Sequence, residues 1–150
     1  MSDESLSTFL SFRLSGQSRY ASGEPVILRF SVSNGSDRTV WLLSWLSPLE
    51  GLRGDILTVV CDGKVLPYEG IMMKRGDPAK ADYIEIGPNG TAFKDFDLSL
   101  SYTLSPSRDC KVEFSGHFLD ACLIEGNVPR KREQFKPFNI DGDGLVFEIL

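Results

Sequence analysis

Apolar and polar residues alternate with a period of two along much of the chain, as they do in strands that bury one face. The clearest example is the segment 25–33, where one face collects Val26, Leu28, Phe30 and Val32. Similar patterns predict strands at 8–14, 39–45, 56–61, 64–66, 82–86, 91–98, 110–114 and 144–150. A sustained apolar repeat at helical spacing is absent from the sequence, so the chain is predicted to be all-β.

Turn residues separate these segments at short intervals. Asn34-Gly35-Ser36-Asp37 and Asp62-Gly63 can supply the positive φ angles of tight reversals, so each is predicted to close a hairpin. Strands at this spacing, about seven to nine in number, predict an immunoglobulin-like antiparallel β-sandwich. A small barrel is the alternative architecture.

The sequence predicts a single domain over residues 1–150, because this length suits one core and neither a linker nor an internal repeat is visible. Residues 1–7 are expected to form a flexible N-terminus. The segment 126–138 is basic, polar and interrupted by prolines, so it is expected to be a surface loop.

The formal net charge of −5 disfavours nucleic acid as a partner, because binding to phosphates requires clustered Lys and Arg. The basic run Arg130-Lys131-Arg132 has no aromatic platform beside it and is interpreted as a solvated loop. The acidic start does not resemble a secretory signal, and no apolar run approaches the ~20 residues of a membrane span. These features predict a cytoplasmic protein that does not bind membranes, although the mature form of a secreted precursor would also lack a signal.

Three cysteines, Cys61, Cys110 and Cys122, form an odd set with wide spacings. Neither a disulfide framework nor a zinc site built from close cysteine pairs has this pattern. Buried free thiols are the favoured interpretation, and a Cys110–Cys122 disulfide is the alternative in an oxidising compartment.

Several short motifs follow one another in an order known from one family. They are Gly23-Glu24-Pro25-Val26, Val32-Ser33-Asn34, Leu42-Leu43 with Ser47-Pro48-Leu49-Glu50, Tyr68-Glu69-Gly70 with Lys74-Arg75, Asp82-Tyr83-Ile84 with Ile86, and Phe96-Asp97-Leu98-Ser99 with Tyr102. Over roughly residues 10 to 116, this order resembles the β-sandwich domain that precedes the catalytic domain in deuterolysin-like and peptidyl-Lys zinc metallopeptidases. The resemblance implies a sandwich that assists or restrains a peptidase.

The chain departs from that family at the residues that carry its chemistry. Those peptidases bind zinc through a His-Glu-x-x-His helix, whereas this chain contains one histidine, His117. We therefore expect a stand-alone sandwich that is not an enzyme and needs no cofactor. A peptidase-associated inhibitor, chaperone or adaptor would fit this description.

Other catalytic arrangements have little support in the sequence. A Ser-His-Asp site would need His117 as its base, and the chain lacks a Gly-x-Ser-x-Gly motif that presents a nucleophile. Alternation points Cys110 towards the core, where a thiol stays protonated and inert. A hydrolase with a pair of carboxylates remains an alternative, because that pairing depends on distances that a sequence does not give.

The segment 139–144 matches the first half of a calcium-binding loop, with Asn139, Asp141 and Asp143 at alternate positions. Its twelfth position is Leu150, where the closing ligand should be a glutamate. A plain turn is favoured, and a module that binds calcium or a small ligand is the alternative function. Arg-Gly-Asp occurs at 53–55 and 75–77, where solvated turns are the favoured interpretation over integrin ligands.

The segment 41–49 is apolar on both faces of its expected strand, whereas one face of such a sandwich is normally solvated. Either the irregular stretch 67–81, with Ile71-Met72-Met73, covers the second face, or that face is exposed for a partner. The favoured function is a protein- or peptide-interaction module whose partner is another protein, for example a peptidase, or a second copy of the chain. The residues predicted to bind this partner are Trp41, Leu42, Trp45, Leu46, Leu49, Met72 and Met73.

Overall fold

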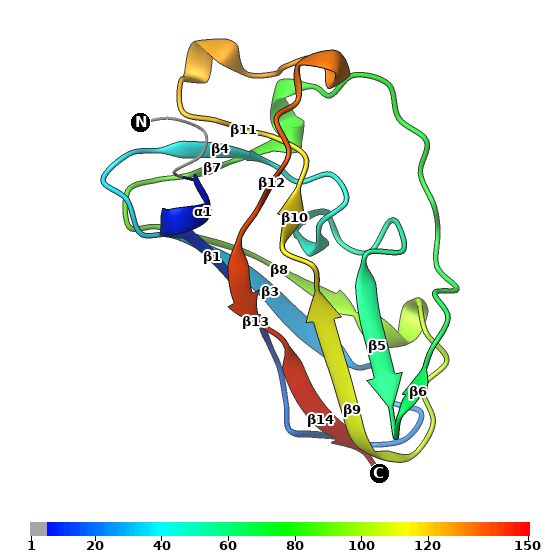
Figure 1. The fold of residues 1–150 in the computed structure, drawn as a ribbon. Helices are drawn as coiled ribbons and strands as arrows, with labels where there is room; N and C mark the ends of the chain where they lie inside the picture. The colour runs from blue at the N-terminus through cyan, green and yellow to red at the C-terminus, as the bar shows by residue number, and fades with distance from the viewer. Residues whose placement is uncertain (1–5) are drawn as a thin grey trace.

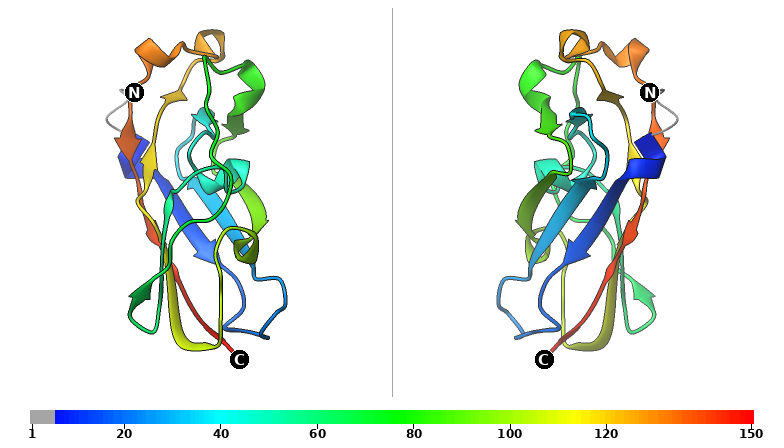
Figure 2. Two further views of the ribbon diagram at one scale, coloured as in Figure 1. Left: turned by 90° about the vertical axis from the view of Figure 1, so that its right-hand side faces the viewer. Right: turned by 90° about the vertical axis from the view of Figure 1, so that its left-hand side faces the viewer.

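Two β-sheets packed face to face form the body of the computed structural model, which describes residues 6–150 (Figures 1 and 2). The first sheet has the spatial order β13 (Asp141–Asp143), β1 (Leu10–Ser15), β3 (Ile27–Asn34) and β8 (Thr91–Asp97). The second has the order β2 (Arg19–Tyr20), β14 (Leu145–Ile149), β9 (Ser107–Phe114), β5 (Leu57–Cys61) and β6 (Lys64–Val65). The predicted all-β, immunoglobulin-like sandwich is confirmed.

Two smaller sheets extend the sandwich at one end (Figure 1). In one, β4 (Val40–Leu43) lies between β11 (Ala121–Cys122) and β7 (Tyr83–Ile86); in the other, β10 (His117–Phe118) pairs with β12 (Phe138–Asn139). The short helical elements are α1 (Leu6–Phe9), η2 (Pro48–Glu50), η3 (Lys80–Asp82), η4 (Leu98–Leu100), η5 (Glu125–Asn127) and η6 (Arg132–Gln134). Eight strands of the described chain contain four residues or more, within the predicted range. No helix between residues 6 and 150 is long and apolar enough to cross a membrane.

The main core lies between the two large sheets, where the alternating apolar side chains of both meet. Phe30 of β3 packs edge-on against Phe114 of β9, with ring centroids 5.2 Å apart, and Phe12 of β1 contacts the same ring at 5.3 Å. Burying each such side chain contributes about 1.5–3 kcal/mol to folding. Leu6 of α1 also belongs to this core, at 1% exposure, so the prediction of a flexible N-terminus over residues 1–7 is wrong for Leu6. Residues 1–5 lie outside the described part of the chain.

The turn at Asn34–Asp37 does not close a hairpin, because the chain leaves the first sheet there. The buried side chain of Asn34 donates from Nδ2 to the carbonyls of Arg38, Ile86 and Gly87. Its Oδ1 accepts hydrogen bonds from the backbone N–H and the hydroxyl of Ser36. These bonds stabilise a corner that leads β4 into the small sheet beside β7, so the hairpin prediction is wrong at this position.

The second predicted hairpin is confirmed, since β5 pairs with β6 through Asp62 and Gly63, at φ 49° and 79°. Beside this turn, Cys61 and Cys110 face each other on β5 and β9 and form a disulfide. The favoured prediction of free thiols is therefore wrong for these two residues, and so is the Cys110–Cys122 alternative. Cys122 keeps its thiol, which is buried and donates weakly to the carbonyl of Asn127 at 3.8 Å.

Candidate binding cleft

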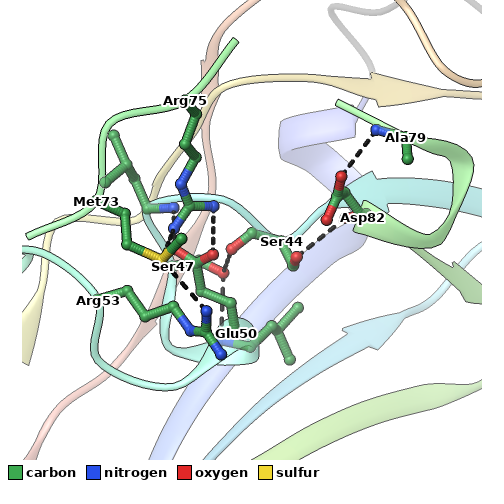
Figure 3. Close-up of polar contacts among 10 residues, drawn as sticks. Ser44, Ser47, Glu50, Arg53, Met73, Arg75, Ala79 and Asp82 are labelled. Atoms are coloured by element: carbon green, nitrogen blue, oxygen red, sulfur yellow. Dashed lines mark hydrogen bonds and ion pairs between the residues drawn. The ribbon is translucent and has the colours of Figure 1, made fainter. Parts of the chain in front are cut away.

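The chain makes a compact turn after β4 that points successive side chains in opposite directions. Ser44 donates from its N–H and its hydroxyl to the carbonyl of Asp82, and the hydroxyl of Ser47 donates to the carbonyl of Ser44 (Figure 3). Leu46 lies at φ 54°, and its N–H donates to Oε2 of Glu50 at 2.8 Å. As a result Trp45 is buried, whereas Leu46 is 41% exposed.

A second, smaller hydrophobic cluster covers the face of β4 that points away from the main core. Its buried members are Leu43, Trp45, Tyr83 and Cys122, and its half-buried members are Trp41, Leu119, Val128 and Phe135. Phe135 meets Trp45 edge-on, with ring centroids 6.4 Å apart. The segment 126–138 lies at the surface, but its half-buried Val128 and Phe135 pack inward against this cluster.

Arg75 covers another side of Trp45, with its guanidinium carbon 4.9 Å from the ring centroid. Nη1 of Arg75 forms an ion pair with Oε1 of Glu50 at 2.5 Å, and Nη2 lies 3.6 Å from the sulfur of Met73 (Figure 3). The side chains of Arg75 and Glu50 are only 12% and 9% exposed. Nε of Arg75 is buried without a hydrogen-bond partner among the described residues.

Two surface segments that are distant in sequence meet beside this ion pair. Nη1 of Arg132 donates to the carbonyl of Arg75 at 2.6 Å, and the N–H of Arg132 donates to Oδ1 of Asp77 at 2.9 Å. On the other side, the N–H of Met73 donates to the carbonyl of Arg53 at 3.3 Å. These bonds fix the stretch around Met73 and Arg75 against both η6 and the chain that follows η2.

A cleft of about 400 Å³ opens where these segments meet. Its lining residues are Trp45, Leu46, Met73, Arg75, Leu119, Arg132, Phe135 and Pro137, and we call it the Trp45 cleft. Leu46 and Met73 are exposed large apolar side chains of this lining, at 41% and 45%. A second cavity of about 350 Å³ adjoins the Trp45 cleft and shares Trp45, Met73 and Arg75 with it.

A buried carboxylate supports the segment that forms one wall of the cleft. Asp120 is fully buried and accepts hydrogen bonds from the guanidinium of Arg130, the hydroxyl of Tyr83 and the N–H of Lys136. Burial of Tyr83, followed by its hydrogen bond to Asp120, raises the pKa of the Tyr83 hydroxyl, which therefore stays protonated and donates. The wall thus rests on a fixed polar network in addition to apolar contacts.

The structure separates the seven residues predicted to bind a partner. Leu42 and Leu49 lie in the main core, at 0% and 7% exposure, and Trp45 lies in the second cluster. The prediction of an exposed patch is wrong for these three residues, because they are buried in the two hydrophobic clusters. Trp41 is half-buried, packed against the second cluster. Leu46 and Met73 line the Trp45 cleft, whereas Met72 is 76% exposed and is not part of its lining.

Several lining residues were not predicted, although the sequence carried a signal for two of them. Arg75 begins the second Arg-Gly-Asp motif and Arg132 ends the basic run, and both motifs were interpreted as solvated. Asp77 of the same motif accepts the N–H of Arg132, so these polar groups contact each other. Leu119, Phe135 and Pro137 gave no signal, because their approach to Trp45 depends on the path of a long connection.

One of the three candidate calcium ligands is bonded to another side chain, and the other two lie on an edge strand. Oδ1 of Asn139 hydrogen-bonds to Nδ1 of His117 at 3.0 Å, and Asp141 and Asp143 are exposed residues of β13, which pairs with β1. Within residues 6–150, no group of three or more His, Cys, Asp or Glu side chains is arranged to hold a metal ion. The carboxylates of Glu50 and Asp120 each form an ion pair with an arginine.

The sequence matches no family model, and no curated protein matches it. The resemblance to the sandwich domain of zinc metallopeptidases therefore stays a prediction from short motifs.

Proposed function

We propose that this chain is a non-enzymatic interaction module that binds a peptide segment of a partner protein in the Trp45 cleft. The observation that carries the proposal is a concave surface of about 400 Å³ with mainly apolar walls, two arginines and two exposed apolar side chains. Small-ligand and peptide sites have this size and this mixture of surfaces. Trp, Met and Arg are also enriched at protein interfaces.

The polar contacts that hold the walls of the Trp45 cleft favour a binding site over an apolar surface that is merely exposed. The Arg75–Glu50 ion pair, the Arg132–Asp77 hydrogen bond and the network around Asp120 hold the walls before a ligand arrives. A preformed site loses less conformational entropy on binding than a mobile one, which favours affinity.

A peptidase is a partner worth testing, because the sequence resembles the domain that accompanies a zinc peptidase. An inhibitor, a chaperone and an adaptor all require the peptidase to contact the sandwich, and the Trp45 cleft is our proposed contact site.

A second copy of the chain is the other partner to test. Light scattering across a range of protein concentrations tests it, because self-association through the cleft should be weakened by Leu46→Asp.

The cellular location of the protein affects which partners it meets. The Cys61–Cys110 disulfide supports an oxidising compartment over the predicted cytoplasmic location, since thiols in the cytosol are kept reduced. We therefore propose that its partners are proteins of an oxidising compartment.

A displayed library of random peptides tests the proposed function directly. The full chain is the bait, and Leu46→Asp and Met73→Asp are the variants that place a charge on the cleft lining. The matched control is Val65→Asp, an exposed residue of β6 at the opposite end of the sandwich (Figure 1). We expect the wild type and the control to enrich the same peptides, and both cleft variants to lose them. Enriched peptides that bind all four proteins equally would contradict the proposal.

Affinity for an enriched peptide can be measured through Trp45 itself. The chain contains two tryptophans, so Trp41→Phe leaves Trp45 as the only one. A peptide that enters the cleft should change the emission of Trp45 with a saturable dependence on concentration. An unchanged emission at saturation would place the peptide elsewhere.

A further inference from the structure

The segment beside the Trp45 cleft is basic in an otherwise acidic protein. Residues 130–136 contain the four basic residues Arg130, Lys131, Arg132 and Lys136 and one acidic residue, Glu133, whereas the whole chain has a net charge of −5. The charge of Arg130 is neutralised by Asp120. Lys131, Arg132 and Lys136 are exposed, so their positive potential acts on whatever approaches this wall.

The lining of the cleft has the same sign of charge. It includes Arg75 and Arg132 and no Asp or Glu. Glu50 neutralises Arg75, but the side chain of Arg132 donates to a carbonyl, which leaves its positive charge uncompensated by that contact. Within residues 6–150, the side chain of Arg132 donates from Nη1 alone. A guanidinium at the edge of an apolar cleft favours a carboxylate, with which it can form two parallel hydrogen bonds.

We infer that the Trp45 cleft binds an acidic, apolar peptide segment, in which a large apolar side chain lies next to Asp or Glu. The apolar side chain packs among Leu46, Met73 and Phe135, and the neighbouring carboxylate pairs with Arg132. This inference rests on the proposed function and adds the chemical class of the ligand.

The shape and charge of the site favour this ligand over other anions. Nucleic acid is disfavoured because its phosphates would be repelled by a chain of net charge −5. An anionic membrane surface is disfavoured because it is too flat to enter a cleft of about 400 Å³. An apolar peptide without a carboxylate would leave Arg132 partly desolvated without a compensating partner, which costs binding energy. A basic peptide would be repelled by Arg132 and by the flanking lysines.

A peptide library displayed with both ends blocked tests the inference, because every carboxylate in it then comes from Asp or Glu. We expect the wild type to enrich peptides with a large apolar residue within one or two positions of an acidic one. Enrichment of apolar peptides without acidic residues would overturn the inference and leave the proposed function intact. No enrichment over the Leu46→Asp variant would overturn both.

A double-mutant cycle then assigns the carboxylate to Arg132. One arm replaces the acidic residue of an enriched peptide by its amide, Glu→Gln or Asp→Asn, and the other replaces Arg132 by Gln. Charged hydrogen bonds of this kind change affinity by roughly 10- to 100-fold, so the wild type should bind the amide peptide about tenfold more weakly or worse. The Arg132→Gln protein should bind both peptides alike.

The control for this cycle is Arg13→Gln, which removes an exposed arginine of β1 that does not line the cleft. The control protein should discriminate the two peptides as the wild type does. Because Arg132 also donates to the carbonyl of Arg75, its loss can lower the affinity for every peptide, but it should abolish discrimination only if it pairs with the carboxylate. Full discrimination by Arg132→Gln would overturn the assignment.

Discussion

Arg130 forms a two-point ion pair with the fully buried carboxylate of Asp120, with Nη2–Oδ1 at 2.5 Å and Nε–Oδ2 at 3.0 Å. Asp120→Asn keeps the shape of the side chain but leaves a largely buried guanidinium without its counter-charge. Breaking one partner of a buried pair costs about 3–5 kcal/mol, so we expect a loss of this order in the free energy of unfolding, measured by chemical denaturation.

The matched control is Asp95→Asn, because Asp95 forms an ion pair with Arg29 in which both side chains are largely exposed. Exposed pairs are screened by solvent, so this variant should unfold at nearly the same denaturant concentration as the wild type. Asp120→Asn should also release the segment around Phe135 and increase acrylamide quenching of Trp45 in a Trp41→Phe background. Equal stability of the two variants would contradict the role assigned to Asp120.

The sequence predicted local structure well where local chemistry decides it. Asp62-Gly63 closes a two-residue hairpin as expected, because both residues accept the positive φ that this turn requires. Asn34 shows the limit of the same argument. Its turn residues were recognised, but its side chain bonds to Ile86 and Gly87, and contacts across 52 and 53 residues decide that the chain turns a corner.

The candidate site was predicted only in part for a similar reason. The two-faced apolar character of 41–49 left open whether the second face is covered or exposed for a partner, and the structure shows that it is covered. Phe135 and Arg75 provide this cover by packing against Trp45. Their distances from Trp45 depend on the path of the chain and cannot be read from a sequence. Leu46 and Met73 were predicted as partner-binding residues and line the cleft, whereas Arg132 was interpreted as part of a solvated loop.

The Cys61–Cys110 disulfide should contribute to stability by restricting the unfolded chain. It closes a loop across a sequence separation of 49 residues. Chain-entropy arguments give about 4 kcal/mol for a loop of this size, as an upper value. We expect reducing agent, or the double variant Cys61→Ala with Cys110→Ala, to lower the free energy of unfolding in the same way.

Thiol labelling under denaturing conditions checks the pairing. Without reductant, mass spectrometry should find one labelled cysteine, Cys122, and with reductant three. Reductant should lower the free energy of unfolding of Cys122→Ala by no more than it lowers that of the wild type. Labelling of Cys61 in the unreduced protein would contradict the disulfide.

The tyrosines should make the protein sensitive to alkaline pH. Burial is the main cause that raises the pKa of each of the chain's four tyrosines, Tyr20, Tyr68, Tyr83 and Tyr102, and it raises the pKa of Tyr102 to about 12. In the unfolded chain these groups ionise near pH 10. The unfolded chain therefore loses its tyrosine protons first, so the contribution of the tyrosines to stability is constant below about pH 10 and falls as the pH rises towards 12.

Tyrosinate absorbance and circular dichroism, followed together during an alkaline titration, test this expectation. Tyrosinate should appear late and together with the loss of structure. Tyr102→Phe removes one contributing group and should make the fall in stability shallower. Ionisation of all four tyrosines near pH 10 with the fold intact would show that burial does not raise their pKa values.

We expect calcium to leave the melting temperature of the protein unchanged, because Asn139, Asp141 and Asp143 are not expected to form a site. A ligand that binds only the folded state raises its melting temperature by mass action. Because Asn139 pairs with His117 and the two aspartates are exposed along β13, we expect no shift in melting temperature at millimolar calcium. A shift that Asp141→Asn abolishes would restore calcium binding as a function.

Leu46 allows binding to be separated from folding, because its backbone conformation does not suit its side chain. A φ of 54° is unfavourable for leucine and is tolerated best by Gly, Asn and Asp. Leu46→Asn should relieve this strain at the cost of little packing, since the side chain is 41% exposed. We expect its free energy of unfolding to equal the wild-type value or exceed it by up to about 1 kcal/mol. Leu46→Val places a branched side chain at the same φ and should be less stable than both.

The two variants should have the opposite order in peptide affinity. Leu46→Val keeps an apolar wall in the Trp45 cleft, whereas Leu46→Asn replaces it with an amide that the apolar part of a ligand cannot use. If Trp45 emission reports that the more stable Asn variant binds an enriched peptide more weakly, the loss comes from the cleft and not from unfolding. An Asn variant less stable than the Val variant would mean that side-chain packing, rather than the positive φ, dominates at Leu46.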